Sequence, residues 1–144
     1  MLLTATLTCV VLAASLILGL AGGTPVAVAH LAFAAGVLPL IFGAIAHFVP
    51  VLTRSGEPAS PVAAIPPLAQ VFGLAIAAAL EGLLPRWILH PAALADLVLA
   101  LGLLAWVIGR ARRCLGTPHP GWRWYAGALG CCAAALAAVP LIAA

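Results

Sequence analysis

The sequence predicts an all-α fold, a polytopic transmembrane bundle of about five helices with its N-terminus inside. Of the 144 residues, 66% are hydrophobic and 6% are charged, whereas soluble domains are about 45–50% apolar and about 25% charged. So few polar groups cannot cover a water-facing surface. Several stretches reach the roughly 20 apolar residues that a helix needs to cross a bilayer. The polar/apolar alternation of a membrane β-strand is missing, so helices are the architecture that satisfies the backbone in lipid.

The five expected spans form a single domain, residues 1–144. They cover residues 2–21, 27–52, 66–84, 88–109 and 123–143. Small residues follow the first span, so it could be a retained helix or a cleaved secretory signal. Its length and the lack of Lys or Arg before it favour a retained helix. In the second span, Pro39 removes one backbone hydrogen bond and predicts a kink. The chain ends without a polar tail, so we expect a short protein or a fragment of a longer one.

The arginines predict the orientation of the bundle. Five of the six fall on one side of a five-span arrangement: Arg54, Arg110, Arg112, Arg113 and Arg123. Only Arg86 falls on the other side. The positive-inside rule then places the N-terminus in the cytoplasm and the protein in the cell inner membrane as a multi-pass protein. A net charge of +3, scattered along the chain, is too small to indicate nucleic-acid binding.

Polar residues within the spans are candidates for function, because they cost a few kcal/mol to bury in lipid. They fall into two layers. The outer layer contains His30, Glu81, His90 and Asp96, and the inner layer contains His47, Gln70 and His119. We expect Glu81 to pair with Arg86 at the interface.

Histidine is the usual axial ligand of haem b. By depth, His30 could pair with His90 near the outer face, and His47 with His119 near the inner face. His30 and His47 are about 25 Å apart along one helix, at 1.5 Å per residue, so they would serve different sites. His30, His47 and His90 are the metal ligands we expect. Gln70 and Asp96 would orient the ligands by hydrogen bonds, with Gln70 bonded to His47. Alternatively, Gln70, Glu81 and Asp96 would act as proton relays.

The second span also resembles a known family. The run His30, Gly36, Ile41-Phe-Gly43-Ala-Ile-Ala-His47-Phe-Val-Pro50 is similar to a helix of the haem-copper oxidase subunit I-like and NnrS-like multi-pass respiratory membrane proteins. The resemblance implies haem, with copper as a further metal, and a role in respiratory electron transfer or nitric-oxide-related metabolism. The later histidines of an oxidase centre are missing, so we do not expect this chain alone to be a complete enzyme.

The sequence therefore predicts a haem-binding membrane protein that carries electrons or holds haem for a partner. Because its glycine-lined helix faces need partners, we expect a homo-oligomer or a larger membrane complex in the lipid bilayer. Two alternatives stay open. One is a cofactor-free transporter or channel subunit with a proton or substrate pathway through His30, Glu81, His90 and Asp96. The other is a passive assembly subunit whose histidines are merely packed.

Overall fold

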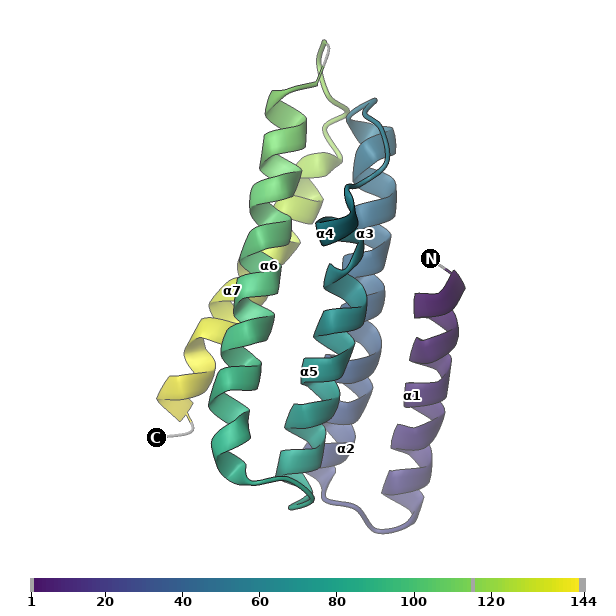
Figure 1. Cartoon of the computed structure of the whole chain (residues 1–144), viewed down its shortest axis with the longest axis vertical. Helices are drawn as coiled ribbons and strands as arrows, with labels where there is room; N and C mark the ends of the chain where they lie inside the picture. Colours follow the sequence, from purple (N-terminus) through teal and green to yellow (C-terminus); the bar gives the residue numbers. More distant parts are fainter. Residues whose placement is uncertain (1, 115, 143–144) are drawn as a thin grey trace.

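The computed structural model describes residues 2–114 and 116–142, and all regular structure in this part of the chain is helical. Five helices run antiparallel as a bundle (Figure 1), which confirms the all-α fold class. Three of them are long and apolar enough to cross a membrane: Pro25–Leu52, Ser60–Leu80 and Arg86–Arg112. The first helix is shorter and also apolar. The chain is thus built as a multi-pass membrane protein.

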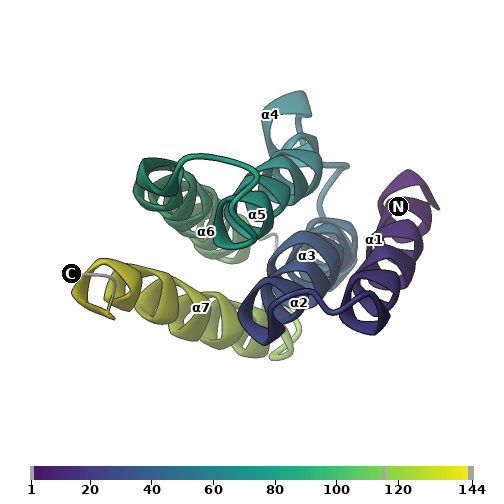
Figure 2. The same cartoon turned by 90° about the horizontal axis from the view of Figure 1, so that it is seen from below.

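Several of the five helices consist of more than one element. The elements are α1 (Leu2–Leu20), α2 (Pro25–Ala32), η1 (Phe33–Val37), α3 (Leu38–Leu52), α4 (Ser60–Ala63), α5 (Ile65–Leu80), η2 (Arg86–Ile88), α6 (Leu89–Arg112) and α7 (Trp122–Ile142). The second helix is the continuous rod α2–η1–α3. Seen from below, α1 lies at the edge of the bundle beside this rod, and α5, α6 and α7 complete the other side (Figure 2).

The observed helices begin and end near the predicted spans, except for the third. Its main element, α5, begins at Ile65, next to the predicted start at residue 66, and the short element α4, with Pro61 in its first turn, precedes it. It ends at Leu80 rather than at residue 84. Gly82 takes a positive φ of 81° there, and the N–H of Leu83 bonds to the carbonyl of Ala78, which closes the helix as a Schellman motif. The expected end of the last span, residue 143, lies outside the described residues.

The kink expected at Pro39 takes the form of a π-helical turn, η1, directly before that residue. The N–H of Leu38 bonds to the carbonyl of Phe33, five residues back. In a regular α-helix the ring of Pro39 would crowd the carbonyl of Ala35, and the wider turn relieves this contact. The hydroxyl of Thr8 on α1 donates a buried hydrogen bond of 3.2 Å to the carbonyl of Gly36 within η1.

Helix α5 packs closely against η1. A Cβ atom placed on Gly73 would lie 2.5 Å from the carbonyl carbon and oxygen of Ala34, so only glycine permits this approach. Further along the rod, Phe42 and Ile45 pack in a fully buried core with Leu103 of α6 and Leu129 of α7. These contacts hold the rod against α5, α6 and α7.

The loops collect at two ends of the bundle (Figure 1). The loops after α3 and α6 share one end, which carries five of the six arginines, and the loops after α1 and α5 share the other. At the arginine-rich end, Arg110 donates hydrogen bonds to the carbonyls of Gly56 and Glu57, both 3.1 Å, and lies over the Trp106 ring. The grouping of arginines that the sequence indicates is therefore present in the fold.

Candidate functional site

An apolar cavity of about 700 Å³ lies between α2, η1, α3, α5, α6 and α7. Its volume falls within the roughly 300–1,000 Å³ that ligand sites occupy. Alanine, leucine, isoleucine, valine and Phe33 side chains make up most of its wall, and the π turn η1 contributes part of it. π turns are frequent at functional sites. The residues with polar side-chain atoms in the wall are His30, Asp96 and Cys132.

Asp96 is the most unusual of these residues. It lies on α6, its side chain is 1% exposed, and neither carboxyl oxygen has a hydrogen-bond partner among the described residues. An ionised carboxylate without a partner is costly to bury, and a native buried polar group without one calls for an explanation. Because Asp96 lines the cavity, a ligand there could supply the missing partner.

His30 lies on α2, in the wall of the same cavity, and its ring orientation is fixed. Its Nδ1 atom lies 2.9 Å from the carbonyl oxygen of Val26. Since a carbonyl only accepts, Nδ1 carries the proton, and Nε2 is the acceptor atom of the neutral ring. A histidine held in this way can bind a metal or accept a hydrogen bond through Nε2. His30 and Asp96, which the sequence places in one outer layer, thus share one cavity.

His90 does not line this cavity. It is exposed near the start of α6, and the wall there is formed by its neighbour Leu89. His30 and His90 therefore do not line a common cavity in the structure, and their pairing at a haem stays a prediction.

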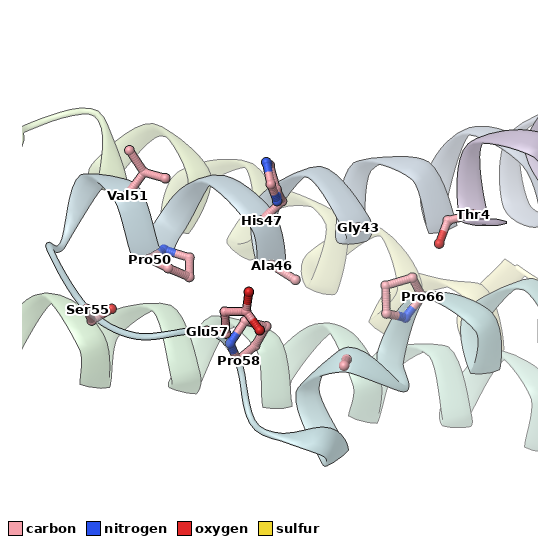
Figure 3. Close-up of a pocket in the computed structure, with 11 residues that line it drawn as sticks. Thr4, Gly43, Ala46, His47, Pro50, Val51, Ser55, Glu57, Pro58 and Pro66 are labelled. Carbon is pink, nitrogen blue, oxygen red and sulfur yellow. The ribbon is translucent and has the colours of Figure 1, made fainter. Parts of the chain in front are cut away.

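His47 belongs to a second, smaller cavity of about 410 Å³ near the arginine-rich end. The motif residues Gly43, His47 and Pro50 line it together, along with Glu57 of the following loop. Figure 3 shows the His47 ring pointing away from the Glu57 carboxylate. The ring is exposed and makes an edge contact with Phe48, with ring centroids 5.1 Å apart. His47 and Glu57 therefore do not form a joint metal site.

His119 orders the loop before α7. Its backbone N–H bonds to the carbonyl of Leu52, and its Nδ1 accepts a bond of 3.1 Å from the N–H of Gly121. It lines neither cavity, so the expected pairing with His47 is not formed in either of them.

The contacts expected for Gln70, with His47, and for Glu81, with Arg86, are not formed. Gln70 is buried in the helix packing of α5, and its amide nitrogen has no partner, so it does not donate to the exposed His47. Glu81 accepts hydrogen bonds from the backbone N–H and the hydroxyl of Thr24, at 3.2 and 3.0 Å. It therefore ties the loop after α1 to the loop after α5 instead of pairing with Arg86.

Sequence reasoning missed the cavity itself. Phe33 and Cys132 help to line it, and neither stands out from the apolar residues around it in the sequence. Within residues 2–114 and 116–142, no group of three or more His, Cys, Asp or Glu side chains is arranged to hold a metal ion.

Comparison of the chain with protein-family models, with curated proteins and with solved structures finds no match.

Proposed function

We propose that this membrane protein binds a lipid-soluble ligand in the cavity between α2 and α7 and carries it, or protons, across part of the bilayer. The observation that carries the proposal is the buried, unpartnered carboxyl group of Asp96 in an apolar wall. Ionisable residues inside membrane bundles typically mark substrate or proton pathways. His30, with its free Nε2 atom in the same wall, is the second group on this pathway. Of the four relay residues expected from the sequence, these two line the cavity.

A lipid-soluble carbodiimide tests whether Asp96 can be reached from the membrane. The O–H of a carboxylic acid adds across one C=N bond of the reagent, and the adduct rearranges to a stable N-acylurea that mass spectrometry locates. The chain has only three acids, Glu57, Glu81 and Asp96, so the labelled site is easily assigned. We expect labelling at Asp96 in membranes, its loss in Asp96→Asn, and its retention in Glu81→Gln. Unlabelled Asp96 beside a labelled Glu57 would contradict the proposal.

Haem binding in the same cavity is the second candidate function. It is favoured by the His30 geometry, because a hydrogen bond from Nδ1 to a carbonyl is the arrangement that leaves Nε2 free to bind iron. The apolar wall fits a macrocycle, and bound haem would supply one-electron redox chemistry. The resemblance of the His30–Pro50 segment points to the same cofactor. His30 is the histidine of the cavity wall that would hold the haem iron, because His90 lies outside the cavity.

A reduced-minus-oxidised spectrum of the purified protein, with pyridine extraction, tests this candidate. Haem binding predicts a haem band in the wild type that His30→Ala removes and His90→Ala retains. A colourless preparation after expression with added haem would eliminate haem and leave the carrier proposal standing.

A further inference from the structure

We propose that the ligand of the cavity is a lipophilic monovalent cation, such as a protonated or quaternary amine with an apolar body, and that Asp96 is its counter-ion. This inference rests on the proposed carrier function and names the class of molecule that the cavity selects. It follows from the sign and placement of the charge in the cavity wall.

The cavity offers one anionic group and no cationic partner for it. None of the six arginines lies in its wall, and Asp96 forms no hydrogen bond or ion pair within the described part of the chain. The other titratable groups that line it are His30 from α2 and Cys132 from α7. An ionised carboxylate buried among apolar side chains is stabilised strongly by a cation at close range. A ligand with a positive charge therefore complements this wall, whereas an anion is repelled.

The rest of the cavity wall favours a ligand whose body is apolar. The side chains around Asp96 are mostly aliphatic, and they come from the rod and from all three helices opposite it. A small hydrated cation would lose its water shell there without replacement ligands, since no other carboxylate lines the cavity. An amine or onium ion with bulky hydrocarbon groups instead buries apolar surface as it brings its charge to Asp96.

Phe33 supplies a second contact for a cation. It belongs to the π turn η1, it lines the cavity, and its side chain is 66% exposed. A cation over a phenyl face gains roughly 0.5–2 kcal/mol, more when it is desolvated. The cavity wall thus contains one aromatic side chain, on η1, and one carboxylate, on α6.

The test compares two ions of the same shape and opposite charge. Tetraphenylphosphonium and tetraphenylborate are each measured by equilibrium dialysis against the purified protein, with protein-free micelles as background. We expect saturable binding of the cation alone. Asp96→Asn should weaken it by at least about tenfold, while Glu81→Gln, which alters a carboxylate outside the cavity, should leave it unchanged.

A second variant protects the test against misfolding of Asp96→Asn. Ala135 of α7 lines the cavity and its neighbour Ala134 does not, although both are exposed. Ala135→Trp fills the cavity and should reduce cation binding by a similar factor, and Ala134→Trp should not.

Equal binding of both ions, or cation binding that survives both Asp96→Asn and Ala135→Trp, would overturn the assignment of a cation. If carbodiimide labels Asp96 and neither ion binds, the cation class is wrong and the carrier proposal stands. If Asp96 is not labelled while Glu57 is, the proposed function fails.

Discussion

At the residue scale, single side chains decide which helices can approach and which polar groups stay unpaired. Asp96 on α6 and Gln70 on the neighbouring helix α5 are both buried, and each has side-chain atoms without a hydrogen-bond partner. Gln70 lines neither cavity. Of the two residues, Asp96 is the one that belongs to a cavity wall, with both carboxyl oxygens buried there. That combination makes Asp96 the stronger functional candidate, although both residues are polar and both lie within predicted spans.

Gly73 provides the clearest stability prediction at this scale. In Gly73→Ala, the new Cβ would meet the Ala34 carbonyl group at 2.5 Å, so α5 or η1 must shift. We expect a loss of about 1–3 kcal/mol in stability, which is typical of overpacking, measured by thermal unfolding in detergent. Gly102→Ala is the matched control, since a Cβ there meets nothing within 4 Å. An equal effect of the two substitutions would contradict the close approach.

At the scale of elements, the π turn η1 connects three features of the fold. It accommodates Pro39, it lies against Gly73 of α5, and it contributes wall to the large cavity. Within the described residues, helix α1 packs mainly against the rod α2–η1–α3. Two polar side chains hold it there, through bonds from Thr8 to the Gly36 carbonyl and from Ser15 to the Val28 carbonyl, at 3.2 and 3.0 Å.

Thr8→Val tests how α1 is attached. The substitution keeps the shape of the side chain and removes the hydroxyl that bonds to Gly36. We expect a loss of about 1 kcal/mol, because the buried carbonyl then lacks this donor. Protease protection of α1 in detergent should decrease as well. Thr4→Val, at a half-buried position of the same helix, serves as the comparison, and a larger effect at Thr4 would count against the role of Thr8.

At the scale of the whole molecule, the arrangement of helices separates two chemically different ends. The end formed by the loops after α3 and α6 carries five arginines, and the other end carries Arg86 and the Thr24–Glu81 contact. In a bilayer, the positive-inside rule predicts that the first end faces the cytoplasm. The large cavity has a polar group at His30, in the last turn of α2, the part of the rod that follows the loop at the other end.

Cysteine accessibility tests this orientation. In a variant whose four native cysteines are replaced by alanine, Leu83→Cys and Thr117→Cys place single thiols at exposed positions of opposite ends. We expect a membrane-impermeant maleimide to label Leu83→Cys in intact cells and Thr117→Cys only after permeabilisation. The reverse pattern would invert the bundle and show that the arginine bias does not set its topology.

The sequence alone determined the all-α class, the helices and the grouping of the arginines. These features follow from local composition. A long run of apolar residues forms a helix across lipid, and charged residues and prolines end that helix. The kink near Pro39 was predictable for the same reason, although its form as a π turn depends on contacts with Thr8 and Gly73 that lie far away in sequence.

Only the tertiary structure decided which polar residues meet. The depth in the bilayer inferred from the sequence places His30, His90 and Asp96 in one layer. Depth does not give the direction in which a side chain points around its helix. Packing of α6 against α5 and α7 turned Asp96 inward to the cavity and left His90 exposed outside it. The cavity itself is a volume between six elements, and no local pattern encodes it, because it depends on how closely whole helices can approach one another.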